Sequence, residues 1–291
     1  MINWATASEL DRADQQRSSP EWVAQQWRSE RASVVVIDER GRFATKPGGD
    51  RLDLARPSAE YDSQRHHLLG LLAGLPIFAA QSTHSTKSAE VHDFREVAAS
   101  LTDSERDIVA TAAALTQWHL REPRCPACGE ATQVIKGGFA RHCLTCSHDH
   151  FPRTDPAVIV AVLDADDRLL LGSQASWPAR RVSILAGFVE TGESLEQCIH
   201  REIAEEVGVQ LAAVRYYGSQ PWPFPRSLML GFAARASSLD ICVDGDEIEF
   251  ADWFTRQQVR DQVASGALGL PGASSIAYRM IYSWLDGDLP V

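Results

Sequence analysis

One segment, residues 187–209, constrains the fold of this chain more than any other part of the sequence. Toward its end it carries three glutamates, Glu202, Glu205 and Glu206. At about 100° per residue, a helix places these glutamates on a stripe that is apolar one and two turns earlier. The segment therefore predicts a helix over residues 194–207, ended by a glycine at the next position, with carboxylates continuing its core-facing stripe.

This arrangement of carboxylates predicts a metal site. Three carboxylates on a core-facing stripe repel one another and lose hydration. Divalent cations relieve both costs, and Mg²⁺ prefers carboxylate oxygens. Arg201 lies four residues before Glu205 and can orient its carboxylate. The alternative is an ordinary solvated acidic face, but the angular positions of the glutamates oppose it.

The composition limits the partners that such a site can have. With 28 Lys and Arg against 39 Asp and Glu, the 291-residue chain has a formal net charge of −11. This balance argues against broad, charge-driven nucleic-acid binding, but it allows a phosphate-bearing ligand whose charge is offset locally. No run approaches the roughly 18 apolar residues of a membrane span, and the first residues are unlike a secretory signal. We therefore expect a cytoplasmic protein of about two domains, with no membrane partner.

Four of the six cysteines form two C-x2-C pairs separated by 14 residues. They are Cys125, Cys128, Cys143 and Cys146. This spacing is typical of one tetrahedral zinc ion, and four thiolates leave no position open for catalysis. A nucleic-acid-binding ribbon is the alternative, because Lys136, Arg141 and His142 lie between the pairs. We expect the other two cysteines, Cys198 and Cys242, to be buried.

Elsewhere the pattern predicts mixed secondary structure. Short apolar runs at 33–37 and 68–72 suggest a mixed α/β domain, and a capping box at 102–105 begins a helix that extends to about Leu120. Strands are expected at 157–163, 168–172, 182–185, near 216 and at 228–234, and helices near 255–264 and 274–285. Strands mixed with a few helices in about 140 residues indicate an α+β sandwich.

The glutamate segment matches the Nudix box, G-x5-E-x7-R-E-U-x-E-E-x-G-U with U aliphatic, at every fixed position. Those positions are filled by Gly187, Glu193, Arg201, Glu202, Ile203, Glu205, Glu206, Gly208 and Val209. The chain thus resembles the Nudix hydrolases, which hydrolyse nucleoside diphosphates linked to another moiety. The resemblance implies an α+β fold: a Nudix α/β/α sandwich at 153–291, preceded by a zinc ribbon at 121–152 and an N-terminal mixed α/β domain at 1–120 that ends in a helix.

A second motif, SQPWPFPRS at residues 219–227, narrows this resemblance. It is similar to the SQPWPFPxS array of the Nudix NADH pyrophosphatases, whose zinc ribbon also precedes the Nudix domain. The resemblance implies an enzyme that hydrolyses the pyrophosphate of NAD(H) to AMP and nicotinamide mononucleotide, with removal of NAD caps from RNA as a further activity. The alternatives are a broader dinucleotide or nucleotide-sugar Nudix diphosphatase, and a non-catalytic Nudix ligand sensor or zinc-ribbon RNA binder. The complete glutamate set opposes the sensor.

The resemblance also implies a catalytic metal site with two or three Mg²⁺ or Mn²⁺ ions. Their ligands would be the carbonyl of Ala186 and the carboxylates of Glu202, Glu205, Glu206 and Glu247. Glu247 is chosen because it stands six residues before Trp253, and Glu249 is its nearest alternative. We expect Glu206 to act as the general base, with Glu193 and Glu205 as the next candidates.

The dinucleotide pocket follows from the same resemblance. Its lining would be Phe151, Gln220, Pro221, Trp222, Pro223, Phe224, Pro225, Arg226, Ser227 and Ala277. Two residues depart from the family, since many relatives have Tyr in place of Phe151 and Glu in place of Gly138. These departures leave the preference between oxidised and reduced NAD open. We also expect a homodimer.

Overall fold

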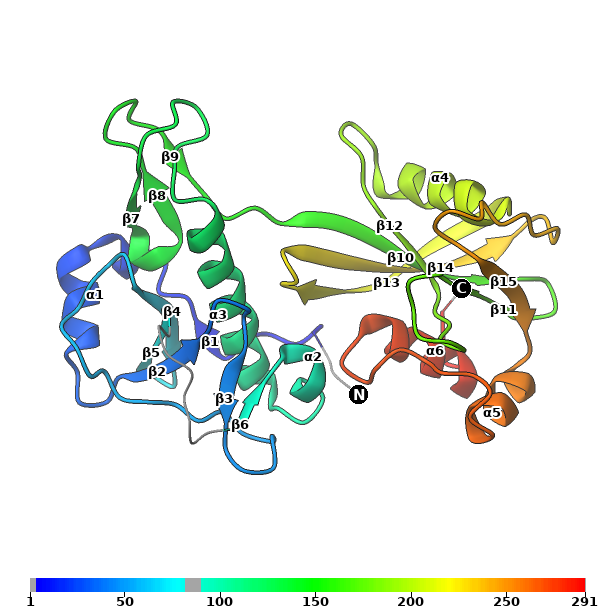
Figure 1. Ribbon diagram of the computed structural model, residues 1–291, viewed down its shortest axis with the longest axis horizontal. Helices are drawn as coiled ribbons and strands as arrows, with labels where there is room; N and C mark the ends of the chain where they lie inside the picture. Colours follow the sequence, from blue (N-terminus) through cyan, green and yellow to red (C-terminus); the bar gives the residue numbers. More distant parts are fainter. Residues whose placement is uncertain (1–3, 82–89, 291) are drawn as a thin grey trace. The chain divides into compact units, whose positions relative to one another are not determined.

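The computed structural model describes residues 4–81 and 90–290, and it divides the chain into two compact units (Figure 1). The amino-terminal unit comprises Thr6–Thr154 together with Trp222–Arg226. The carboxy-terminal unit is built mainly from Asp155–Pro221 and Ser227–Val291. Among the described residues, no helix combines the length and the apolar character needed to cross a bilayer.

A six-stranded sheet in the order β1-β4-β5-β2-β3-β6 forms the centre of the amino-terminal unit. Its strands are β1 (Leu10–Asp11), β2 (Ser33–Ile37), β3 (Phe43–Thr45), β4 (His66–Leu72), β5 (Leu75–Gln81) and β6 (Glu90–His92). The helices are the 3-10 helix η1 (Gln16–Ser18), α1 (Pro20–Trp27), α2 (Phe94–Val97) and α3 (Asp103–Arg121). Both predicted apolar runs are strands, and the predicted capping box of α3 is present between Thr102 and Glu105. The prediction of a mixed α/β domain is confirmed.

The cysteine segment forms a small antiparallel sheet with the order β7-β8-β9. Its elements are β7 (Gln133–Ile135), the 3-10 helix η2 (Lys136–Gly138), β8 (Ala140–His142) and β9 (Asp149–His150). Arg141 in β8 is 6% exposed and donates from Nε to Thr132 Oγ1 at 2.6 Å. Because Arg141 is buried, it does not supply an exposed positive charge for the nucleic-acid-binding alternative.

The carboxy-terminal unit is an α/β/α sandwich, as the sequence predicted. Its sheet has the order β13-β14-β10-β11-β15, with β12 paired to β10. Figure 1 shows α4 on one face of this sheet and α5 with α6 on the other. The strands are β10 (Asp155–Leu163), β11 (Leu169–Ser173), β12 (Leu185–Phe188), β13 (Leu211–Trp222), β14 (Ser227–Ala236) and β15 (Phe250–Phe254); the helices are α4 (Leu195–Val207), α5 (Arg256–Ala264) and α6 (Ile276–Asp286).

Two predictions for this unit are wrong. The strand expected at 182–185 begins only at Leu185, because the segment that pairs with β10 is Leu185–Phe188. Cys242 is exposed rather than buried, because it lies in a loop outside the sheet, where its N–H donates to Val207 O. Cys198 is buried as expected.

The amino-terminal unit contains a buried pair of histidines. The rings of His67 and His119 lie 4.1 Å apart, and His119 Nε2 is 2.8 Å from Gly138 O. The guanidinium of Arg141 lies 2.9 Å from His119 Nδ1, so the ring has no place for a second proton. Burial lowers the pKa of His119 to about 4 and that of His67 well below its usual value.

We expect acid to destabilise the protein through His119. The unfolded chain binds a proton near pH 6.5 and the folded chain only near pH 4, so stability is lost as the pH falls through this window. Between pH 8 and pH 5, titration of His119 should lower the free energy of unfolding by about 2 kcal/mol. His119→Gln keeps a donor and an acceptor but does not titrate, so this decrease should be absent from the variant. Urea unfolding of both proteins at the two pH values measures this difference. Equal losses in the two proteins would contradict it.

Candidate active site and zinc centre

The four predicted cysteines come together in one cluster. Their sulfur atoms all lie within 4.8 Å of one another, with Cys125 to Cys146 and Cys128 to Cys143 both at 3.5 Å. A tetrahedral ion with Zn–S bonds of about 2.3 Å requires sulfurs about 3.8 Å apart. The cluster therefore fits one structural zinc ion.

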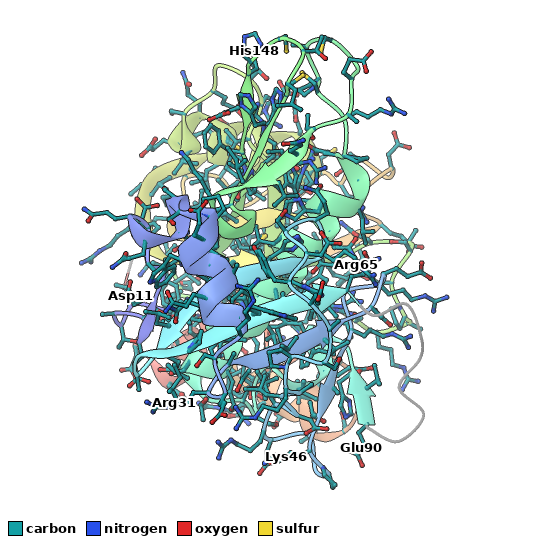
Figure 2. All side chains as sticks on the ribbon, turned by 90° about the vertical axis from the view of Figure 1, so that its left-hand side faces the viewer. Asp11, Arg31, Lys46, Arg65, Glu90 and His148 are labelled. Carbon is teal, nitrogen blue, oxygen red and sulfur yellow. The ribbon has the colours of Figure 1, made fainter. Side chains whose placement is uncertain are left out.

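Two histidines that sequence analysis missed contact this cluster. His148 Nδ1 lies 3.2 Å from Cys146 Sγ, and His150 Nε2 lies 3.1 Å from Cys125 Sγ. Figure 2 shows His148 at the top of the view, close to the sulfur atoms of the cysteine cluster. Ring N–H groups in this position offset thiolate charge and orient the ligands. Their location directly after the second cysteine pair was the available signal.

The predicted glutamate helix is α4. Ser194 caps its start through a capping box with Gln197, and Gly208 ends it with a left-handed φ of 72°. The three glutamates are not equivalent, because α4 packs on the sheet along one face only. Glu206 is 3% exposed, whereas the side chain of Glu202 is 12% exposed and that of Glu205 is 63% exposed.

Glu206 has the most unusual environment of the three. Burial, and then the negative charges of Glu202, Glu247, Asp244 and Glu205, raise its pKa to about 8. Its Oε2 atom is buried and has no hydrogen-bond partner among the described residues. A buried, unpartnered carboxylate oxygen among other carboxylates is the environment that a divalent cation stabilises. The residues present therefore fit a catalytic metal.

The carboxylate oxygens are more widely spaced than the cysteine sulfurs. Within residues 4–81 and 90–290, the four cysteines form the one set of three or more ligand atoms that lie within 4.8 Å of one another. Because like charges repel, a shared cation would have to draw the glutamate side chains together.

Arg201 forms ion pairs with Glu193, Glu202 and Glu205. Its Nε and Nη2 atoms each lie 2.9 Å from an oxygen of Glu193, and Nη1 lies 2.8 Å from Glu202 and 3.1 Å from Glu205. The bidentate bond to Arg201 lowers the pKa of Glu193 to about 2. Glu193 is therefore a poor proton acceptor, and its contacts fit an orienting role.

The strand that precedes the helix approaches Glu202 closely. A Cβ atom at Gly187 would lie 1.9 Å from Glu202 Cδ, so a larger residue there would displace this carboxylate. Ala186, whose carbonyl is a predicted ligand, is the residue just before Gly187 in β12. Phe188 follows, 58% exposed, with its carbonyl 3.1 Å from Arg201 Nη2. The sequence analysis did not identify Phe188 as a site residue. Its position directly after Gly187, the first glycine of the Nudix box, could have indicated it.

The structure separates the two candidates for the last acidic ligand. The charge of Glu247 acts on both Glu202 and Glu206. Glu247 and Glu249 are both exposed, and the N–H of Glu249 donates to Ser173 O in β11. Glu247 is therefore the better candidate.

The SQPWPFPRS motif lies at the turn between β13 and β14, and its residues fall in different units. Gln220 is 2% exposed and donates from Nε2 to Ser274 O at 2.7 Å. In the amino-terminal unit, the rings of Trp222 and Phe224 lie 6.4 and 5.7 Å from Phe94. The rings of Trp222 and Phe224 thus pack near another aromatic ring, and the Gln220 amide donates a hydrogen bond to a backbone carbonyl.

The remaining predicted pocket residues are also divided between the units. Pro221, Ser227 and Ala277 belong to the carboxy-terminal unit, and Phe151, Pro223, Pro225 and Arg226 belong to the amino-terminal unit. Ala277 is 5% exposed, whereas Phe151 is 52% exposed, with Lys136 Nζ 5.4 Å from its ring centre.

Gly138, one of the two departures from the family pattern, has a physical reason in the fold. Its φ is 109°, and a Cβ atom there would lie 2.6 Å from His67 Cβ. The buried histidine pair therefore excludes a larger residue at this position.

Three family profiles match the chain in succession. The NADH pyrophosphatase-like rudimentary NUDIX domain matches residues 29–118, the NADH pyrophosphatase zinc ribbon domain matches 121–151, and the NUDIX domain matches 153–270.

The chain is also similar to named proteins over 64% to 94% of its length. It is 38% identical to the NAD-capped RNA hydrolase NudC of Mycobacterium bovis over 94% of this chain and 92% of that protein. It is 41% identical to the human NAD-capped RNA hydrolase NUDT12 over 64% of this chain and 43% of that protein. Among solved structures, a NUDIX hydrolase from Nitrosomonas europaea is 20% identical, with a TM-score of 0.40, over 50% of this chain and 96% of that one.

Proposed function

Because the chain belongs to the Nudix hydrolases of the NADH pyrophosphatase type, with a zinc ribbon and an N-terminal NUDIX-like domain, we propose that it hydrolyses the pyrophosphate bond of NAD(H). The products are AMP and nicotinamide mononucleotide. We propose NAD-capped RNA as a second substrate, supported by the relatives that bear this activity in their names. The observation that carries the proposal is the buried, unpartnered carboxylate of Glu206 among its acidic neighbours.

The proposed metal ligands are the carbonyl of Ala186 and the carboxylates of Glu202, Glu205, Glu206 and Glu247. Two or three Mg²⁺ or Mn²⁺ ions held by these residues would supply positive charge for the diphosphate and would make the attacking water more acidic. The single zinc ion at the four cysteines is structural.

The chain's own residues have separate tasks in this reaction. Glu206 accepts the proton of the attacking water, since its Oε2 atom has no hydrogen-bond partner among the described residues and is available as an acceptor. Arg201 keeps Glu202 and Glu205 oriented, and Glu193 keeps Arg201 in place. The exposed ring of Phe188 is available beside them for stacking.

Three further features belong to the proposal. The protein forms a homodimer, and its domains span residues 1–120, 121–152 and 153–291. It functions in the cytoplasm, where a reducing environment keeps thiols available as zinc ligands.

Product analysis tests the proposed function directly. The full chain is incubated with NADH, NAD⁺, ADP-ribose or NAD-capped RNA, each with Mg²⁺ or Mn²⁺. AMP and nicotinamide mononucleotide are expected from NADH or NAD⁺, and a 5′-monophosphate end from the RNA. Hydrolysis of ADP-ribose with NAD(H) left intact would instead indicate a broader Nudix diphosphatase.

Substitution of Gln220 tests whether the SQPWPFPRS motif contributes to substrate selection. Gln220→Ala removes the amide that holds Ser274 O just before α6, at a cost of about 1–3 kcal/mol for a lost buried hydrogen bond. If this anchor shapes the dinucleotide pocket, kcat/KM for NADH falls more than kcat/KM for ADP-ribose. The measured quantity is the ratio of kcat/KM for NADH to that for ADP-ribose, with Ser219→Ala as the control. An unchanged ratio would mean that Gln220 acts only in folding.

A further inference from the structure

The loop between β14 and β15, residues 237–249, carries Glu247 outside any helix or strand. The position of Glu247 therefore depends on what holds this loop in place. One tie is a main-chain hydrogen bond from Asp244 N–H to Glu206 O, at 3.2 Å. The loop is thus attached, three residues before Glu247, to the helix that carries the other glutamates.

The carboxylate of Asp244 supplies the second tie. Its Oδ1 accepts from Ile248 N–H at 2.9 Å, and its Oδ2 accepts from Glu247 N–H at 3.2 Å. The nearby N–H groups of Gly245 and Asp246 also stabilise its negative charge. Ile248 is 2% exposed and belongs to the core under α4. Both oxygens are thus occupied by amide donors, which suits a carboxylate that organises a turn rather than one that binds a cation.

We propose that Asp244 is a positioning residue for Glu247, whose main chain it fixes within reach of Glu202 and Glu206. The proposal rests on the proposed function, in which Glu247 is a ligand of the catalytic cation. The negative charge of Asp244 also acts on Glu206. Its effect through the loop must therefore be separated from simple attraction of a cation by its charge.

The two effects of Asp244, on the loop and on the charge of the site, can be separated by measuring how tightly the full chain binds Mn²⁺ alone. The electron paramagnetic resonance signal of free Mn²⁺ reports this binding. Asp244→Ala removes the charge and both acceptors, and it should weaken Mn²⁺ binding by about tenfold or more. Asp244→Asn removes the charge but keeps one acceptor oxygen, so its loss of affinity should be smaller than that of Asp244→Ala. Asp246→Ala removes the same charge from the same loop and should bind Mn²⁺ as the unmodified chain does. Equal losses in Asp244→Ala and Asp246→Ala would overturn the proposal.

A double-mutant cycle identifies the residue through which Asp244 acts. In a Glu247→Gln background, Asp244→Ala should cause little further loss of affinity, because the positioned ligand is already absent. A full loss in that background would overturn the proposal, since Asp244 would then act elsewhere. Glu247→Gln alone tests the ligand assignment: normal Mn²⁺ binding by this variant would refute that part of the proposed function, and the role of Asp244 with it. In turnover, Asp244→Ala should lower kcat for NADH more than it changes KM.

Discussion

Glu206→Gln should lower turnover of NAD(H) by about 10²–10⁴-fold, the range typical of a lost general base, while the fold stays intact. The substitution keeps the size of the side chain but removes its charge and its ability to accept a proton. Steady-state kinetics with NADH and Mn²⁺ measures the loss. Glu196→Gln, at an exposed position in the first turn of the same helix, serves as the control and should retain activity. Near-normal turnover by Glu206→Gln would refute the proposed mechanism.

The same variant has a second, activity-independent consequence. The pKa of Glu206 is about 8 in the folded, metal-free chain, against about 4.5 when unfolded. Ionisation of Glu206 therefore lowers the free energy of unfolding. The full stability is present below pH 4.5 and is lost as the pH rises through 8. Glu206→Gln lacks this cost, so its Tm without added Mg²⁺ or Mn²⁺ should exceed that of the unmodified chain at pH 8.5, and the difference should narrow at pH 5.

Cys125→Ser should abolish zinc binding and lower Tm by about 10 °C or more. Structural zinc sites contribute folding free energy directly, and Cys125 is a buried member of the cluster. Elemental analysis gives the zinc content, and thermal unfolding gives Tm. Cys242→Ser is a matched control, because Cys242 is exposed and lies outside the cluster. One zinc ion per chain in Cys125→Ser, or none in the unmodified protein, would contradict the assignment.

The SQPWPFPRS motif shows where sequence reasoning reaches its limit. The pattern identified the segment and its resemblance, but it gave no partners for the side chains. The Gln220 amide binds Ser274 O, which lies 54 residues further along the chain. Trp222 and Phe224 lie near Phe94, which is far away in sequence and belongs to the amino-terminal unit. Contacts of this range depend on how whole elements pack.

Features that depend on residues a few positions apart could be predicted from the amino-acid pattern. The capped starts of α3 and α4 and the left-handed end of α4 at Gly208 follow from local spacing, because helical periodicity acts over short distances. The four-cysteine cluster was predictable for another reason: its contacting sulfurs lie 15 and 21 residues apart, but one zinc ion requires four thiolates together.

Differences between residues that look equivalent in the sequence arise from the packing of the fold. Glu205 and Glu206 are adjacent in the sequence, yet one is exposed and the other is buried with a pKa of about 8. Likewise, Gly138 is confined by His67, and Asp244 holds the loop of Glu247. Burial and charge depend on which elements pack over a side chain, and that packing joins residues too distant in sequence for any local pattern to relate.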